Sequence, residues 1–159
     1  MKFLRKKDED GSRLASMQAR IFERSANDDI ASYFFIQQFM NSEETILLDN
    51  LNYFLSGLSE WEIYIHTKSA VKRSDGQIYS SDAMHWIGFF YRYASYLTGM
   101  TSKELFKRIH PKFLYQVYPL YHSLDIVKAV QRVFETLNIE QETPSERFFK
   151  LYKAGDIKF

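Results

Sequence analysis

The sequence predicts an all-α protein: a compact single-domain bundle of about seven to eight short helices around a central aromatic-rich helix. Two observations support this fold class. Apolar residues recur at helical spacing along most of the chain, and Ser, Thr or Asn is followed three residues later by Glu at four positions. The second pattern is the capping box of helix N-termini. The four pairs are Asn41 with Glu44, Ser59 with Glu62, Thr101 with Glu104, and Thr143 with Glu146.

The beginning of the chain predicts an arm followed by one domain. Residues 1–12 carry charges of both signs and include Gly-Ser after the acidic run, so we expect a flexible charged arm there. A length of 159 residues fits one domain, and no linker or repeat divides residues 13–159. The segment "IASYFFIQQFM", residues 30–40, is apolar on nearly all sides, which predicts a buried helix.

Two further elements follow from spacing. An apolar stripe predicts an amphipathic helix for which Gly57 is a suitable end; its members are Leu47, Leu51, Phe54, Leu55 and Leu58. Residues 61–80 are ambiguous. "WEIYIHT" alternates as a strand does and "QIYSS" follows a short loop, so a small hairpin is one interpretation. The capping box at Ser59 and the spacing of Trp61, Tyr64 and Ile65 favour a helix.

The stretch "HWIGFFYRYASYLTG" lies in the expected central helix, residues 82–98, with Ser81 or Asp82 as its cap. Its rings cover so wide an arc that the helix must be central to the fold. What remains is a narrow strip of four residues, His85, Gly88, Arg92 and Tyr96. Glycine is a poor helix former, so the glycine in this strip predicts a close approach by a neighbouring chain or a ligand.

The last predicted helices lie in the second half of the chain. The stripe of Leu114, Val117, Tyr118 and Tyr121 predicts a helix that stops or kinks near Tyr118, because Pro119 would clash with the preceding turn. A further stripe predicts a helix over residues 124–138 with Ser123 as its cap. Its members are Val127, Val130, Phe134 and Leu137.

The composition excludes several function classes. The net charge of +1 argues against bulk attraction to nucleic acid or to an anionic membrane. The absence of cysteine excludes disulfides, thiolate metal sites and a cysteine nucleophile. No run of signal-peptide length and no window of roughly 20 apolar residues is present, so we expect a cytoplasmic protein with no membrane partner. The excess is in aromatic residues, 14 Phe, 11 Tyr and 2 Trp, which predicts a core of few large side chains.

Arg92 permits two interpretations. A guanidinium at the edge of an aromatic core is commonly paired with a carboxylate, and the preferred candidate is Asp125. The alternative is a site for a partner or a ligand. Its residues would come from the central helix and from "YPLYHSLD", residues 118–125; they are Arg92, His85, Tyr96, Tyr121, His122 and Asp125.

No motif indicates a catalytic residue, a cofactor or a metal. The four histidines form no i, i+4 pair, and no nucleophile elbow, P-loop or dinucleotide fingerprint occurs. A basic stretch at residues 101–112 resembles the entry to a helix-turn-helix, although a solvated helix face explains it equally well. Its cations are Lys103, Lys107, Arg108 and Lys112.

Three segments carry a family resemblance: "FMNSEET", "WIGFFYRYASYLTGMTSKELFK" and "YPLYHSLD". Over residues 30–135 the chain resembles a family of small Gram-positive bacterial proteins whose genes accompany toxin–antitoxin or phage-defence genes. The shared pattern is Trp-Ile-Gly at 86–88, Tyr-Arg-Tyr at 91–93, Ser-Lys at 102–103 and Tyr-His-Ser-Leu-Asp at 121–125. Ala94 stands where the family often has Trp. The resemblance implies binding to a protein partner.

These observations together predict a non-catalytic protein that binds another protein, encoded next door, as an antitoxin-like or regulatory subunit. A homo-oligomer is also compatible with the composition. One alternative is a nucleic-acid-binding regulator that uses the patch at residues 103–112. A third hypothesis is a small-anion binder or enzyme centred on Arg92, with His85 and His122 around the same pocket.

Overall fold

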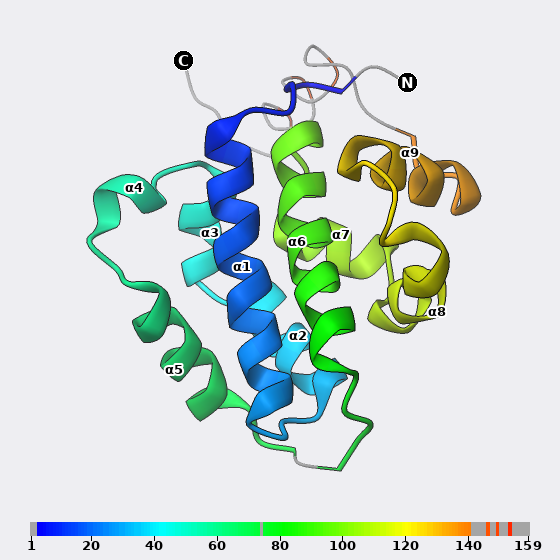
Figure 1. Ribbon diagram of the computed structural model, residues 1–159. Helices are drawn as coiled ribbons and strands as arrows, with labels where there is room; N and C mark the ends of the chain where they lie inside the picture. The colour runs from blue at the N-terminus through cyan, green and yellow to red at the C-terminus, as the bar shows by residue number, and fades with distance from the viewer. Residues whose placement is uncertain (1–2, 74, 141–145, 147–148, 150–152, 154–159) are drawn as a thin grey trace.

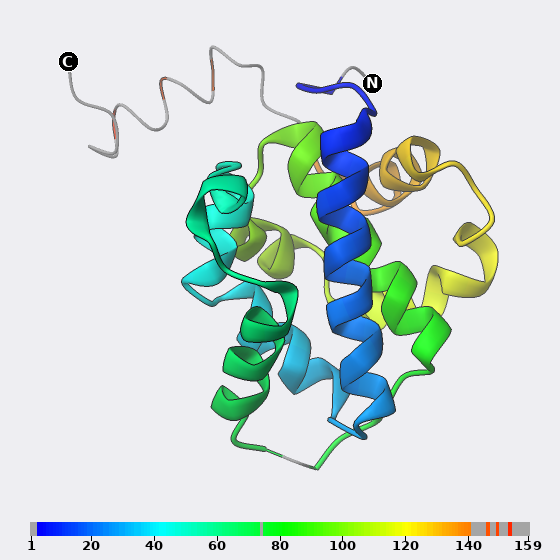
Figure 2. The same cartoon turned by 60° about the vertical axis from the view of Figure 1, so that its left-hand side comes forward.

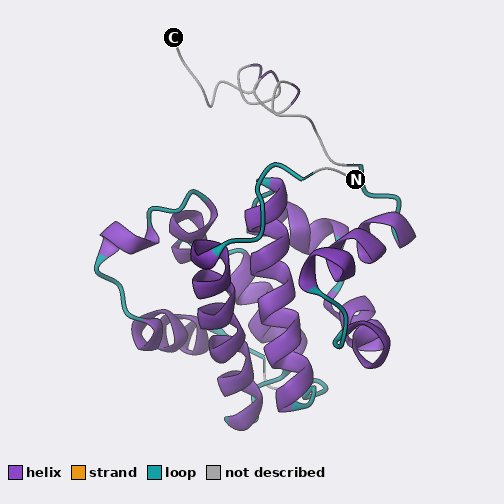
Figure 3. Ribbon diagram, turned by 45° about the horizontal axis from the view of Figure 1, so that its top comes forward, coloured by secondary structure: helices purple, strands orange, loops and turns teal. Residues whose placement is uncertain are grey.

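The computed structural model describes residues 3–73, 75–140, 146, 149 and 153, and every regular element in this part of the chain is a helix (Figure 3). Nine helices are assigned there: α1 Glu9–Asn27, α2 Ser32–Met40, α3 Glu44–Asp49, α4 Tyr53–Ser56, α5 Glu60–Ala70, α6 Ser81–Thr98, α7 Ser102–Arg108, α8 Pro111–Tyr121 and α9 Ile126–Thr136. The all-α prediction is confirmed. The hairpin interpretation of residues 61–80 is wrong, because α5 occupies all of residues 61–70 and no strand follows among the described residues.

Helices α1 and α6 run side by side through the centre of the bundle (Figures 1 and 2). Two glycines allow this close approach. A Cβ at Gly88 would lie 2.7 Å from the backbone oxygen of Gln18, and a Cβ at Gly11 would lie 2.6 Å from Cδ2 of Tyr96. The close approach predicted at Gly88 is therefore confirmed, and the neighbour is α1. Helices α3, α4 and α5 lie on one side of this pair, and α8 and α9 lie on the other (Figure 1).

The core is built from aromatic side chains of several helices. The ring of Phe22 from α1 meets those of Phe35 and Phe39 from α2 edge-on, with centroids 5.9 and 5.1 Å apart. Tyr91 and Tyr93 of α6 are fully buried. Edge-to-face contacts of this kind stabilise beyond the area that they bury. The aromatic-rich centre predicted for residues 82–98 is confirmed, and α1 shares it.

The capping boxes have mixed outcomes. Ser59 and Thr101 accept hydrogen bonds from the backbone N–H groups of Glu62 and Glu104, at 3.1 and 3.2 Å, and so cap α5 and α7 as predicted. Asn41 instead ends α2, where its amide donates to the Gln37 carbonyl at 2.8 Å. The prediction that Asn41 caps the start of a helix is wrong, because its side chain bonds to the end of the preceding helix, α2. The fourth box, at Thr143, lies outside the described residues.

Four helix boundaries differ from those predicted. The stripe from Leu47 to Leu58 is divided into α3 and α4, because the backbone at Leu51 adopts the left-handed region with φ 64°. The helix predicted to stop or kink near Tyr118 does not stop there but continues to Tyr121, since Pro119 falls in its last turn and removes a single intrahelical bond. The caps of α6 and α9 are Ser80 and Asp125, and not Ser81, Asp82 or Ser123.

The predicted arm does not extend to residue 12. Helix α1 begins at Glu9, and its cap Asp8 accepts a hydrogen bond from the Gly11 N–H at 3.0 Å. The preceding residues contact the far end of α6, because the Arg5 N–H donates to the Leu97 carbonyl at 3.0 Å. The boundary is wrong because an acid, a cap and a small residue begin a helix as readily as they form a loop. No helix in the described residues is both long enough and apolar enough to cross a membrane.

Candidate functional site

Arg92 lies in a buried polar cluster at the centre of the bundle and is only 1% exposed. Its Nε donates to Oε1 of Gln18 at 2.7 Å, Nη1 to Oδ1 of Asp49 at 2.7 Å, and Nη2 to Oγ of Ser102 at 2.9 Å. Each guanidinium nitrogen therefore has a protein acceptor. Burial lowers the pKa of Arg92, and the Asp49 carboxylate opposes this shift. The ion pair compensates a charge that would otherwise be costly to bury.

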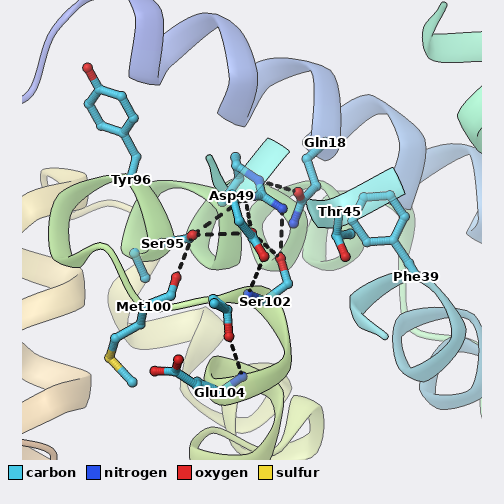
Figure 4. Close-up of polar contacts among 12 residues, drawn as sticks. Gln18, Phe39, Thr45, Asp49, Ser95, Tyr96, Met100, Ser102 and Glu104 are labelled. Atoms are coloured by element: carbon cyan, nitrogen blue, oxygen red, sulfur yellow. Dashed lines mark hydrogen bonds and ion pairs between the residues drawn. The ribbon is translucent and has the colours of Figure 1, made fainter. Parts of the chain in front are cut away.

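Within this cluster, Asp49 connects α3 to the start of α7. Its carboxylate accepts from the N–H of Ser102 at 3.0 Å and from the Ser102 hydroxyl at 2.6 Å, which fixes the start of α7. The labelled side chains of Gln18, Asp49, Ser95 and Ser102 converge on one point, whereas Tyr96 lies away from them (Figure 4). Helices α1, α3, α6 and α7 each contribute one or more of these groups. The cluster therefore holds four helices in register.

The prediction that Arg92 pairs with Asp125 is wrong. Asp125 caps α9 and forms an exposed ion pair with Nζ of Lys7 at 3.0 Å. The carboxylate that reaches Arg92 is Asp49, at the end of α3. The hypothesis of an anion or substrate site centred on Arg92 also loses its basis. The guanidinium is buried, and all of its nitrogens donate to protein oxygens.

The other residues of the predicted ligand site do not converge with Arg92. Tyr96 is 6% exposed and donates to the Asp8 carboxylate at 2.6 Å. Tyr121 is partly buried at the end of α8. His85 and His122 do come together, because both line a recess between α6 and α8. Thus the structure brings two of the six predicted residues to one surface feature and distributes the others among structural contacts.

The basic stretch remains a feature of the surface. Lys103, Lys107 and Arg108 of α7 and Lys112 of α8 are exposed, and none of them forms an ion pair with another residue in the described ranges. Beyond Lys112, the exposed residues of α8 are Gln116, Pro119 and Leu120. These carry no charge, so α8 lacks the row of cations that a helix bound along a phosphate backbone would use.

A groove lies between α1 on one side and α4 and α5 on the other, and is here named the α1/α5 groove. It consists of two adjoining cavities of about 410 and 630 Å³ that share Arg20 and Glu60 in their walls. The guanidinium of Arg20 donates twice to Oε1 of Glu60, at 2.9 and 2.8 Å. This pair lies between the two cavities and links α1 to α5.

Exposed aromatic rings with arginines stacked on them line the α1/α5 groove. Trp61 is 52% exposed and lies 4.4 Å beneath the guanidinium of Arg24; Phe54 is 41% exposed and lies 5.0 Å from that of Arg13. Burial and a hydrogen bond to Asp28 raise the pKa of Tyr64 on the groove wall. Tyr64 is therefore a neutral donor, which fixes the ring behind Trp61.

The sequence carries a signal for this groove in the spacing of its arginines. Arg13, Met17, Arg20 and Arg24 follow one another at helical spacing in "RLASMQARIFER", and all four line the groove. No helix is predicted above for residues 13–24, so this face of α1 has no predicted partner.

Among the described residues, no group of three or more His, Asp or Glu side chains is arranged to hold a metal ion.

Comparison with known proteins gives no further assignment. No family model, no curated protein and no solved structure matches the chain. Conclusions about function therefore depend on the residues and the geometry of this chain.

Proposed function

We propose that this protein acts by binding another protein, and that the α1/α5 groove is its contact surface. The observation that supports this proposal is the pairing of exposed rings with stacked arginines, Trp61 with Arg24 and Phe54 with Arg13, along one concave face. Trp, Tyr and Arg are the residues most enriched at energetic hot spots of interfaces, and such hot spots lie in preformed recesses.

The charges of the groove indicate what a partner would present. Arg20 is neutralised by Glu60, whereas Arg24 forms no ion pair with any residue that the structure describes. A carboxylate on the partner could pair with Arg24 without displacing it from Trp61, because cation–π and ion-pair contacts use different sides of the guanidinium. The partner segment would therefore combine an apolar anchor, placed between Phe54 and Trp61, with an acidic side chain.

The family resemblance suggests where to look for this partner. It implies a product of an adjacent gene in a toxin–antitoxin or defence locus, with the present chain as an antitoxin-like or regulatory subunit. Such a role requires the two proteins to meet in the cytoplasm. Arg92 supports this proposal indirectly. It is the residue on which the alternative of an anion site or active site was centred, and its nitrogens donate to protein oxygens.

The test is co-expression of the chain with the product of the neighbouring gene, followed by purification and titration of the complex. Trp61→Ala should weaken binding by about 30-fold or more, the effect of removing a hot spot worth roughly 2 kcal/mol. Leu120→Ala is the matched control, because Leu120 is a large apolar side chain, 71% exposed, on α8 outside the groove. A chain that binds no neighbouring gene product and leaves its activity unchanged would contradict the proposal.

Nucleic-acid binding is the second candidate function. The observation that favours it is the set of exposed cations on α7 and at the start of α8, which lack acidic partners in the described part of the chain. This function predicts an affinity that falls steeply with salt and is lost in Lys103→Glu combined with Lys107→Glu. Absence of a DNA or RNA shift at every salt concentration would exclude it.

A further inference from the structure

The recess that contains both His85 and His122 has a lining unlike that of the α1/α5 groove. One face of α6 supplies Asp82, His85, Trp86 and Phe89, at i, i+3, i+4 and i+7, and the end of α8 supplies Tyr118 and His122. The recess has a volume of about 280 Å³, below the roughly 300–1,000 Å³ of sites for drug-sized ligands. Helix α8, which lines the recess together with α6, lies on the other side of the α1 and α6 pair from α5 (Figure 1).

The aromatic rings form the walls of this recess. The centroids of Trp86 and Tyr118 are 5.9 Å apart and their planes meet at 57°, so the two rings enclose a corner. Phe89 is a third, partly exposed ring in the lining. Trp86 itself is 8% exposed and packs on Phe90 at 5.3 Å, which holds this wall in place. The faces of such rings are electron-rich and attract cations.

The acidic side chains in and near the recess are negative, and so, like the electron-rich ring faces, they favour a cation. Asp82 is exposed, and its carboxylate makes no ion pair or hydrogen bond with any described residue. No lysine or arginine is present in the lining. A second carboxylate lies nearby, since Nδ1 of His85 donates to Oε2 of Glu23 at 3.3 Å. An anionic ligand would meet the Asp82 carboxylate and no lysine or arginine in this lining, whereas a cation would meet three rings and Asp82.

We propose that this recess binds the methylated ammonium group of a small ligand or side chain. The bulky cationic head fills the corner between Trp86 and Tyr118, in contact with Phe89, and Asp82 faces its charge. A methylated ammonium suits such a site better than a guanidinium, because it has no planar fork of donors to satisfy. The proposal concerns a different surface from the α1/α5 groove, since the two linings share no residue, although His85 of the recess contacts Glu23 of the groove wall.

The test uses the two tryptophans of the chain. Trp61→Phe leaves Trp86 as the only tryptophan, so its fluorescence reports on the recess. Titration with choline should give a saturable change at constant ionic strength. The neutral isostere 3,3-dimethylbutan-1-ol should bind at least about 10-fold more weakly, because it retains the shape without the charge. An equal response to the two compounds, or no saturable response to choline, would overturn the proposal.

Matched variants distinguish the contribution of the Asp82 charge to binding from that of the aromatic wall of the recess. In the same background, Asp82→Asn should weaken choline binding about 3-fold or more, whereas Asp10→Asn should not change it. Both acids are exposed residues in the first turn of a long helix; Asp10 lies outside the recess, and its exposed pair with Arg13 at 4.0 Å contributes little to stability. Tyr118→Leu should abolish binding and Tyr118→Phe should retain it. Equal affinities in the two aspartate variants, each with an intact melting transition, would contradict the assignment.

The same titration distinguishes two sources of the group. A peptide containing trimethyllysine is compared with choline, and unmethylated lysine in the same peptide serves as the reference. Tighter binding of choline would identify a free metabolite, and tighter binding of the trimethylated peptide would identify a modified protein side chain. Preference for unmethylated lysine would overturn the choice of a methylated ammonium.

Discussion

Arg92 is flanked in the sequence by Tyr91 and Tyr93, and Arg24 lies over the ring of Trp61, but the surroundings of the two arginines differ in every other respect. Arg92 is 1% exposed, and all its nitrogens donate to groups from other helices or from the same helix. Arg24 lies over Trp61 at the surface and makes no ion pair with a described residue. The comparison teaches that an arginine within a run of rings is not by itself a sign of function. A satisfied guanidinium holds helices together, and an unsatisfied one can bind a partner.

The largest expected effect comes from removing the carboxylate of the buried pair. Asp49→Ala leaves the Arg92 charge buried and unpaired, so we expect a loss of about 3–5 kcal/mol in the free energy of unfolding, measured by chemical denaturation. The control is Lys7→Ala, which breaks the exposed pair with Asp125 and should cost less than about 1 kcal/mol. Similar losses for both variants would remove the distinction between the buried and the exposed carboxylate.

A second variant tests the packing that places Gln18 beside Arg92. Gly88→Ala inserts a Cβ 2.7 Å from the Gln18 carbonyl and 2.9 Å from the Phe22 ring, so α1 and α6 must separate. The overpacking should cost about 1–3 kcal/mol, although alanine alone would favour the helix by up to about 1 kcal/mol. Thermal unfolding measures the net change. A raised melting temperature would show that the two helices do not approach as closely as described.

A smaller and pH-dependent effect is expected at Tyr96. Burial and the bond to Asp8 raise the pKa of Tyr96 to about 12, above its ordinary value of 10. The neutral hydroxyl is thus favoured in the folded state, so its contribution to stability is complete below pH 10 and is lost between pH 10 and about 12. Denaturation of the wild type and of Tyr96→Phe across this range should show the advantage of the wild type shrinking. A constant difference would contradict this linkage.

The smallest effect on stability belongs to the groove. Trp61→Ala removes a half-exposed ring and its contact with Arg24, so the free energy of unfolding should change by less than about 1 kcal/mol while partner binding falls by far more. Chemical denaturation measures the first quantity, and titration with the partner measures the second. A large loss of stability would place Trp61 with the core and not with the binding surface.

The elements that the sequence predicted well are those with a local cause. The caps Ser59 and Thr101 and the wide apolar arc of residues 82–98 depend on neighbours within one or two turns. The division between α3 and α4 depends on the left-handed backbone of Leu51, which is an unusual conformation for leucine and leaves no mark in the apolar spacing.

The candidate sites were harder to predict, because they depend on which helices meet. Asp49 and Arg92 are 43 residues apart, and no periodicity links them. Asp125 satisfied the same local criteria of charge and helix position, but its partner is Lys7. Likewise, the spacing of Trp61 predicts a helix, but its exposure depends on the groove between α1 and α5, which no local pattern indicates.

The central claim is that Arg92 is structural and that binding occurs in the α1/α5 groove. The most direct measurement is the affinity of the double variant Arg92→Met, Asp49→Leu for the neighbouring gene product, after a cooperative melting transition has shown that it is folded. Replacing both charges with apolar groups leaves neither one buried alone, so folding should be retained. We predict an affinity within about 3-fold of the wild type, a difference of less than roughly 0.7 kcal/mol. A folded double variant that no longer binds would contradict this account.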